Sequence, residues 1–189
     1  FEPLHACILF ERTSFQQITV SLPVYLLDDA NTLGERSWEV DVKAYGADLS
    51  LVAQEKFHQR LPEKYGNQIG TFDLSMHQTD TAPLFVTCDL ILEGKRISRS
   101  FYFSNFEQQR GCIFELPRAA IETSRKEGRI TVKNISNIPV VGLWMHSPGE
   151  DHLTTYSDNF LWLEPDESVS IEVTGVDTNR IKIEALNLM

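Results

Sequence analysis

Short apolar runs of strand length, separated by turn-forming residues, are the feature of this sequence that most limits its fold. In residues 36–45, Trp38, Val40, Val42 and Ala44 alternate with charged side chains. A period of two residues is typical of a β-strand with one buried face and one solvated face. Periodicity of the helical kind is weak throughout the chain, so an all-β fold is predicted.

Seven such runs occupy the first part of the chain: 4–12, 15–27, 36–45, 51–60, 68–75, 84–92 and 96–106. The last two are joined by residues 93–95 (EGK), a short segment that contains glycine. Such a link between two apolar runs predicts a β-hairpin. Seven strands with turn signals between them favour a sandwich of two antiparallel sheets.

The pattern breaks over residues 106–117, which are polar in the middle and end in Leu116-Pro117. We therefore place a domain boundary here and predict domains 1–112 and 113–189. Residues 118–126 offer the best helix candidate, but their length and neighbours favour a strand. Strand-like runs resume at 118–124, 128–135, 139–146, 159–163, 168–174 and 180–186. The sequence thus predicts two tandem immunoglobulin-like antiparallel β-sandwiches.

The net charge limits the binding partners that we expect, and the cysteine content indicates the cellular compartment. The net charge of −10 repels phosphate, so we expect neither nucleic acid nor an anionic membrane as partner. Cys7, Cys88 and Cys112 are odd in number and form no C-x-x-C pair, which disfavours a disulfide scaffold and favours the cytoplasm over a secreted location. No apolar segment is long enough to span a bilayer. Because the chain begins at Phe1, we expect it to be part of a longer protein.

The motifs of catalysis are missing from the sequence. Paired carboxylates carry out glycoside cleavage, but Asp28-Asp29 and residues 150–151 lie in apparent turns and are expected to be solvated. Residues 150–152 (EDH) offer at most a weak cation contact, and the histidines lack metal-site spacing. No nucleophile elbow, P-loop or dinucleotide fingerprint is present. We therefore predict no catalytic residue, no metal site and no cofactor.

Aromatic residues in the second domain are the candidate ligand contacts. Trp144 alternates with aliphatic residues, as does Trp162, so either indole can point outward and stack on a sugar ring. Together with Tyr156 they form the predicted sugar-binding set. The alternative, which is more common in small sandwiches, is that these aromatics pack against a neighbouring domain or the other sheet.

One motif resembles a known family. Residues 156–160 (YSDNF) and 161–167 (LWLEPDE) resemble the (F/Y)-S-D-N-(Y/F)-x-x-L-x-P-G-E signature near the C-terminus of β-mannosidase-type members of glycoside hydrolase family 2. Weaker matches, in the family's order, lie at residues 24–29 (VYLLDD), 101–103 (FYF), 116–119 (LPRA) and 130–136 (ITVKNIS). The chain departs from the family at Asp28, usually Asn, at Asp166, usually Gly, and at Trp162, commonly small or polar.

The resemblance implies a role for the motif and for the chain. Ser157, Asp158 and Asn159 are expected to be structural, because such side chains bond nearby backbone groups. In the family, the two catalytic glutamates lie on a (β/α)₈ barrel that precedes these sandwiches, and this chain has neither the length nor the helices for one. The resemblance therefore implies a non-catalytic accessory region whose partner is the barrel of the same parent chain. That parent would remove terminal β-mannosyl residues by a retaining mechanism.

Three functions remain open from the sequence. The first is the structural module of a glycosidase, which supports its barrel. The second is a carbohydrate-binding module that grips an oligosaccharide through its exposed aromatics. The third is a free-standing immunoglobulin-like adhesion module.

Overall fold

The computed structural model describes residues 3–9, 19–34, 36–58, 67–75, 85–103, 112–149 and 153–188. The chain divides into two compact units, Phe1–Arg110 and Gly111–Met189. Each unit has its own buried apolar cluster. None of the described residues lies in an α-helix; the helical turns present are 3₁₀, at η2 (Cys112–Glu115) and η3 (Thr178–Arg180). Among the described residues, no helix is long and apolar enough to cross a membrane.

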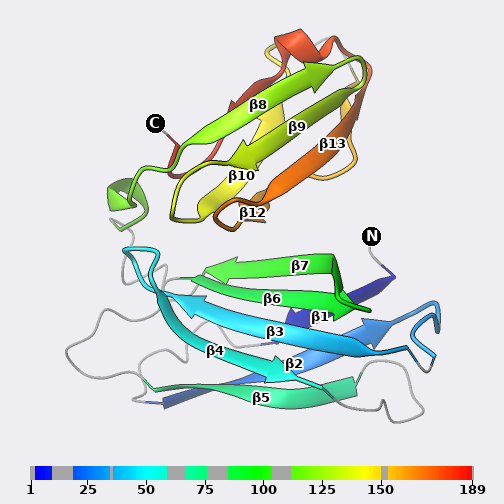
Figure 1. Ribbon diagram of the computed structural model, residues 1–189, viewed down its shortest axis with the longest axis vertical. Helices are drawn as coiled ribbons and strands as arrows, with labels where there is room; N and C mark the ends of the chain where they lie inside the picture. Colours follow the sequence, from blue (N-terminus) through cyan, green and yellow to red (C-terminus); the bar gives the residue numbers. More distant parts are fainter. Residues whose placement is uncertain are drawn as a thin grey trace. The chain divides into compact units, whose positions relative to one another are not determined.

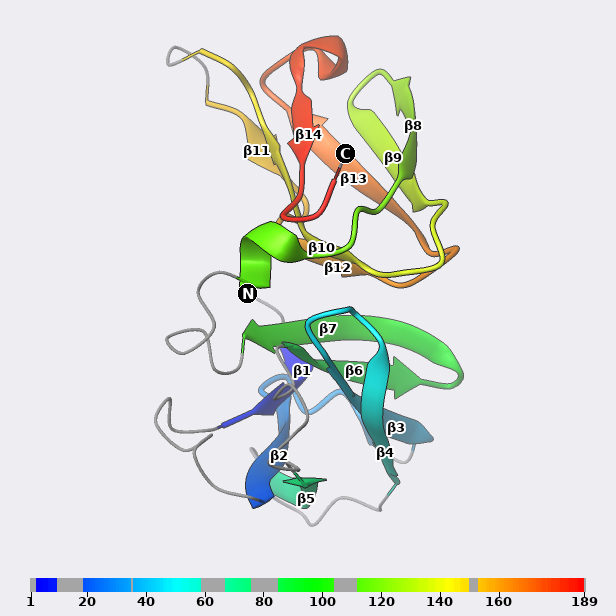
Figure 2. The ribbon, with the colours of Figure 1, turned by 90° about the vertical axis from the view of Figure 1, so that its left-hand side faces the viewer.

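The first unit is a sandwich of two antiparallel sheets, which lie as two layers in Figure 2. One sheet has the order β1 (Leu4–Ile8), β2 (Thr19–Asp28), β5 (Asn67–Ser75). The other has the order β4 (Leu51–Phe57), β3 (Trp38–Tyr45), β6 (Phe85–Leu92), β7 (Lys95–Phe103). Between the layers lie the inward side chains of both sheets, among them Val40 and Val42 of β3, which are fully buried.

The hairpin predicted at residues 93–95 is confirmed. Leu92 pairs with Lys95, so the loop has two residues, Glu93 and Gly94. Both have positive φ, 51° and 80°, which is the backbone that a type I′ turn requires at its two central positions. Glycine adopts this conformation without a steric cost, which explains its place in the turn.

Asp28 corrects one expectation. The residue is buried rather than solvated, with 9% of its surface exposed. It accepts hydrogen bonds from the backbone N–H of Thr32 and of Leu33, both at 2.8 Å, and from the Thr32 hydroxyl at 3.1 Å. The side chain thus closes the turn that follows β2, because a carboxylate satisfies backbone donors that the turn leaves unpaired.

The second unit is also a sandwich of antiparallel sheets, and β8, β9 and β13 form its front layer in Figure 1. One sheet has the order β11 (Thr155–Tyr156), β13 (Ser168–Thr174), β9 (Arg129–Asn134), β8 (Ile121–Lys126). The other has the order β12 (Leu161–Leu163), β10 (Val140–His146), β14 (Lys182–Glu184). The strand expected within residues 118–126 is therefore present as β8. The predicted class of two tandem immunoglobulin-like antiparallel sandwiches is confirmed.

A β-bulge in β10 decides which side chains face the core. The register against β12 shifts between Val140 and Leu143, and Gly142 has a φ of 60°. A bulge adds one residue to a strand and so reverses the alternation of faces beyond it. As a result Val140, Leu143 and Met145 all pack in the core cluster. Val141 is also buried, but it is not part of that cluster.

Candidate functional site

The three residues of the Ser-Asp-Asn motif join the two sheets of the second unit. Ser157 follows β11, donates its N–H to the Glu172 carbonyl at 2.9 Å and accepts the Glu172 N–H on its Oγ at 2.9 Å. The Asn159 side chain binds the backbone of Met145 on β10, in the opposite sheet. Asp158 lies between them and accepts the Asn159 N–H at 2.8 Å. The motif therefore carries the chain from one sheet to the other through side-chain hydrogen bonds to backbone groups.

A second polar side chain holds the other end of β12. Asn134 is fully buried and its Nδ2 donates to the carbonyls of Ile138, Leu163 and Glu164 at 2.8–3.1 Å. Its Oδ1 accepts from the N–H and the hydroxyl of Ser136 at 2.9 and 2.5 Å. Asn134 and Ser136 are the Asn and Ser of the ITVKNIS segment, so this match also falls on residues whose contacts are structural.

Phe160 and Trp144 form an aromatic pair on the outside of the β12–β10–β14 sheet. Their ring centroids lie 6.3 Å apart with an interplanar angle of 20°, a stacked arrangement. Phe160 is 65% exposed, whereas Trp144 is half-buried. Leu143 and Met145, on either side of Trp144, face the core, so the indole faces away from it. The prediction that Trp144 points outward agrees with this placement.

Polar side chains lie beside this aromatic pair. Trp144 is directly opposite Glu184 in the β10–β14 register, and His146 is directly opposite Lys182. The His146 Nε2 lies 3.4 Å from a Glu184 carboxylate oxygen, and the two side chains are 40% and 49% exposed. The aromatic face can stack on a ring-shaped ligand, and the half-exposed polar groups at its edge can hydrogen-bond to one.

The structure does not gather the three predicted sugar-binding residues into one site. Trp162 is only 2% exposed, and its indole Nε1 donates to Glu164 Oε1 at 3.2 Å. Tyr156 is half-buried and packs against the core cluster; burial raises the pKa of its phenol, and a backbone group of Ser147 partly offsets this. The ring of Trp144 stacks on an exposed aromatic neighbour, and sugar binding by the set of three stays a prediction.

Two residues of this region were missed by the sequence analysis. Phe160 was matched to the last position of the YSDNF segment and was not named as a ligand contact, and Glu184 was not singled out. A signal for Glu184 existed, because Lys182 and Glu184 flank the apolar Ile183 and so share the outward face of a strand. A signal for Phe160 also existed, because it alternates with Leu161 as Trp162 does. The pattern does not contain the backbone φ of 59° that turns its ring into solvent.

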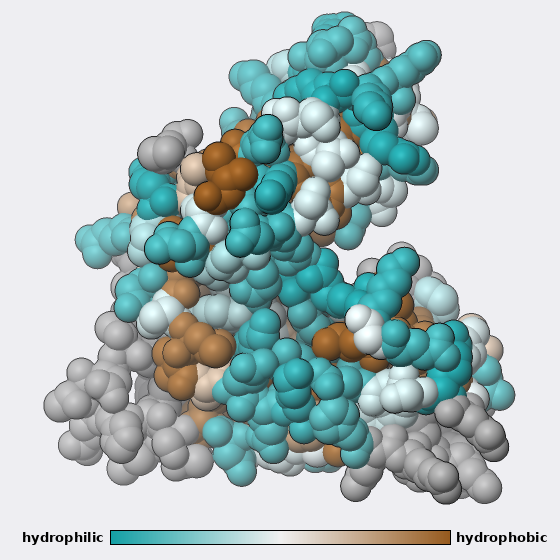
Figure 3. Space-filling model, viewed as in Figure 1, coloured by the Kyte–Doolittle hydropathy of each residue, from teal (hydrophilic) through white to brown (hydrophobic). Residues whose placement is uncertain are grey.

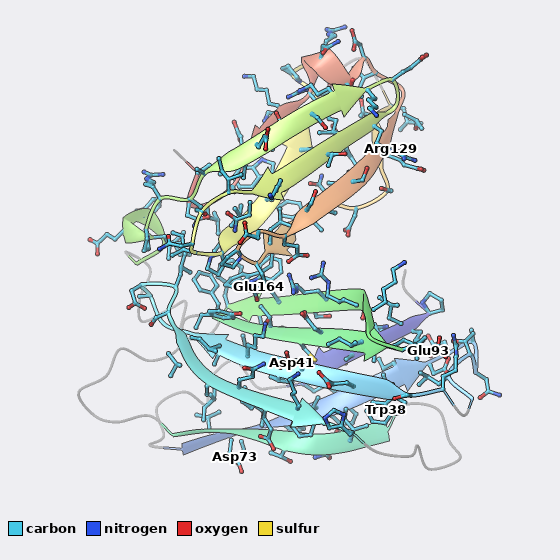
Figure 4. The ribbon with its side chains drawn as sticks, viewed as in Figure 1. Trp38, Asp41, Asp73, Glu93, Arg129 and Glu164 are labelled. Atoms are coloured by element: carbon cyan, nitrogen blue, oxygen red, sulfur yellow. The ribbon has the colours of Figure 1, made fainter. Side chains whose placement is uncertain are left out.

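Charged side chains cover the outward face of the four-stranded sheet in the first unit, where Figure 3 shows hydrophilic residues over β3 and β4. Asp41, labelled in Figure 4, is directly opposite Asp89 across the β3–β6 pair. Asp89 forms a two-pronged ion pair with Arg99, with both N–O distances 2.5 Å. The Asp41 carboxylate accepts from Gln54 Nε2 at 2.8 and 3.0 Å. Both carboxylates are thus held by neighbouring donors, in contrast to carboxylates that converge on a substrate.

Neither the Cys88 thiol nor a group of metal-binding side chains adds reactive chemistry among the described residues. Cys88 is fully buried, and burial raises the pKa of its thiol. No group of three or more His, Cys, Asp and Glu side chains among the described residues is arranged to hold a metal ion. The candidate cation contact at residues 150–152 lies outside the described residues.

Comparison with known proteins was made at the level of sequence and of structure. No protein-family model matches the sequence, and no curated protein matches it. Solved structures do match. The exo-chitosanase CsxA of Amycolatopsis orientalis superposes with a TM-score of 0.66 at 15% identity, over 99% of this chain and 26% of that chain. The β-D-mannosidase of Dictyoglomus thermophilum superposes with a TM-score of 0.59 at 16% identity, over 99% of this chain and 22% of that chain.

The chain shares its fold with part of these glycosidases. A further match is the exo-β-D-glucosaminidase CsxA, which is inhibited by a glucosamine-configured castanospermine. Its TM-score is 0.63 at 15% identity, over 99% of this chain and 26% of that one. This chain therefore spans about a quarter of the length of the solved chains that it matches.

Proposed function

We propose that this chain, with domains 1–112 and 113–189, is the non-catalytic accessory region of a β-mannosidase-like glycoside hydrolase. The observation that carries the proposal is the coverage of the structural matches: 99% of this chain corresponds to 22–26% of each glycosidase. The Ser157-Asp158-Asn159 motif supports it independently, since it is the segment that resembles family 2 of the glycoside hydrolases. In this proposal the parent's catalytic barrel is the partner, and the sandwiches support it.

The chemistry of the described residues is consistent with a supporting role. A retaining glycosidase needs two carboxyl groups about 5–5.5 Å apart that both face the substrate. Asp41 and Asp89 are directly opposite, but each is less than 7% exposed and hydrogen-bonded to Gln54 or Arg99. Neither is free to protonate a leaving group or to attack a sugar. The catalytic groups would accordingly lie on the barrel.

The proposed reaction of the parent is the removal of terminal β-mannosyl residues. Its test begins with the reading frame upstream of Phe1, which should encode a (β/α)₈ barrel with two catalytic glutamates. The full-length enzyme should release nitrophenol from a nitrophenyl β-mannoside faster than from the β-glucosaminide. The 189-residue chain alone should release it from neither.

Three outcomes would overturn parts of this proposal. An upstream frame without a barrel would reject the accessory role. Activity of the purified 189-residue chain that survives repeated chromatography would reject the absence of catalysis. A full-length enzyme that prefers the β-glucosaminide would reject the mannosidase assignment and leave the accessory role intact.

A further inference from the structure

The backbone of Phe160 has a conformation that phenylalanine disfavours, and in this conformation its ring is exposed to solvent. Phe160 has a φ of 59°, in the left-handed region. A residue with a side chain costs on the order of 1–3 kcal/mol there, and such strain is concentrated at binding and catalytic sites. The Oδ1 of Asn159 accepts the Phe160 N–H at 3.1 Å as well as the Met145 N–H. Hydrogen bonds to the motif thus fix a strained conformation whose result is an exposed phenyl ring.

The exposed ring has a support beneath it. Trp144 stacks on one face of Phe160 at a centroid distance of 6.3 Å, and 65% of Phe160 remains exposed. A stacked pair holds the ring in one orientation, and an aromatic face carries negative electrostatic potential. It therefore attracts C–H groups and cations.

The carboxylate nearest in register to this pair is Glu184. It lies directly opposite Trp144 on the same face of the sheet and is 49% exposed. Its neighbour His146 lies 3.4 Å away, and Lys182 is opposite His146, one step further along the strand. Phe160 directly precedes β12, so Phe160 and Glu184 lie on opposite sides of Trp144 in the order β12–β10–β14. A ligand that covers the Trp144–Phe160 pair therefore has an accessible carboxylate at its β14 edge.

The second unit carries more acidic than basic side chains. Residues 111–189 contain twelve acidic and seven basic side chains. Around β12 and on β14 lie Asp158, Glu164, Asp166, Glu167 and Glu184, against Lys182. The acidic excess favours a cationic over an anionic ligand on this unit.

We infer that the Trp144–Phe160 pair and Glu184 form a binding site for an amino sugar, a pyranose that carries a protonated amine, at the end of an oligosaccharide. The C–H face of the sugar covers the Trp144–Phe160 pair, the ammonium group pairs with Glu184 on the β14 side of Trp144, and His146 and Lys182 contact hydroxyl groups. The aromatic pair supplies affinity for the C–H face of a pyranose, and the carboxylate supplies the preference for an ammonium over a hydroxyl. The inference does not rest on the accessory role, which would survive if the site bound nothing.

The test is calorimetric titration of the 189-residue chain with a glucosamine oligosaccharide, below the pKa of its amines and at physiological salt. The N-acetylated oligosaccharide and a manno-oligosaccharide of equal length are the comparisons. We expect saturable binding of the amine form, at least about tenfold weaker binding of the two neutral sugars, and a change of Trp fluorescence with the same dissociation constant.

Paired variants separate the site from general charge attraction. Phe160→Ala and Phe160→Leu should each weaken binding at least about tenfold, and Phe160→Tyr should retain it. Phe114→Ala, at a phenyl ring that is 85% exposed elsewhere in the unit, should bind normally. Glu184→Gln should weaken the amine ligand about tenfold, and Glu122→Gln, which removes the same charge from β8, should not.

The inference is overturned by any of four results. They are the absence of saturable binding, equal affinity for the amine and neutral sugars, unchanged affinity in folded Phe160→Leu, and equal effects of Glu184→Gln and Glu122→Gln. Near-ultraviolet circular dichroism of each variant establishes folding before titration.

Discussion

The side-chain amide of Asn159 binds Met145 as a neighbouring strand would. Its Oδ1 accepts the Met145 N–H at 2.8 Å and its Nδ2 donates to the Met145 carbonyl at 3.1 Å. One residue thereby extends the pairing of β10 beyond the end of β12, where the backbone turns away at Phe160. The most specific sequence match in the chain is thus a substitute for strand pairing.

This contact predicts the effect of Asn159→Asp. The carboxylate keeps the size of the amide but loses its donor, and it sets a negative charge beside the Met145 carbonyl. We expect the free energy of unfolding to fall by about 1–3 kcal/mol, measured by urea denaturation at neutral pH. Asn31→Asp is the matched control, because Asn31 is exposed and has a φ of 50° that Asp tolerates. Equal urea midpoints for the two variants would contradict the prediction.

The turn after β12 predicts how substitutions of Asp166 change the stability of the protein. Glu167 donates its N–H to the Glu164 carbonyl at 3.1 Å, and Asp166 between them has a φ of 61°. Glycine adopts this backbone freely, Asp tolerates it and Ala is disfavoured. We expect Asp166→Gly to be more stable than the natural chain by about 0.5 kcal/mol and Asp166→Ala to be less stable by about 1 kcal/mol. Thermal unfolding of the three proteins would show the order Gly, Asp, Ala; an Ala variant equal to the Gly variant would exclude backbone strain at this position.

The fold was predicted well where the apolar and polar residues of a strand alternate regularly and where glycine marks a turn. Alternation in residues 36–45 identified both faces of β3, and the glycine at position 94 identified the turn before β7. β11 was missed, because a strand of two residues, Thr155 and Tyr156, is too short to show an alternating pattern.

The candidate site was predicted less well, because the alternation of apolar and polar residues does not show which side chains the fold covers. Trp162 has the spacing of an exposed residue and is nevertheless buried. Phe160 stands in the same pattern and is exposed, because its left-handed backbone turns the ring away. Alternation gives the face of a side chain, whereas its exposure depends on what the folded chain places over that face.

Asp28 predicts a dependence of stability on acid. Burial alone would raise the pKa of its carboxyl, but hydrogen bonds from Thr32 and Leu33, with the charge of Arg36, outweigh this and hold the pKa below its ordinary value. The unfolded chain has a pKa of about 3.9 at this group. The stabilisation is therefore fully present above about pH 5 and is lost as the pH falls through the folded-state pKa.

Asp28→Asn tests this contribution. The amide keeps one acceptor and turns an N–H₂ group toward the Leu33 N–H, so we expect the variant to lose about 1–3 kcal/mol at neutral pH. Its disadvantage should shrink as the pH falls below about 4, because the natural carboxyl is then protonated too. Urea denaturation from pH 7 to pH 3 measures both curves. A constant difference between them across this range would contradict the assignment, and exposed Asp29→Asn should match the natural chain at pH 7.

The buried ion pair of Arg99 and Asp89 predicts a large effect of removing one partner. Both side chains are 8% exposed, and Asp89 faces a second carboxylate, Asp41, across the β3–β6 pair. Arg99→Met leaves Asp89 buried beside a like charge without its main counter-charge. Breaking a buried pair in this way costs about 3–5 kcal/mol, so the urea midpoint should fall sharply.

Asp89→Asn combined with Arg99→Met removes the uncompensated charge and should recover part of the loss. Lys56→Met, which breaks the exposed pair of Lys56 with Glu39 at 2.8 Å, should leave the midpoint nearly unchanged. If the double variant is less stable than Arg99→Met alone, the cost does not come from an unpaired Asp89 carboxylate.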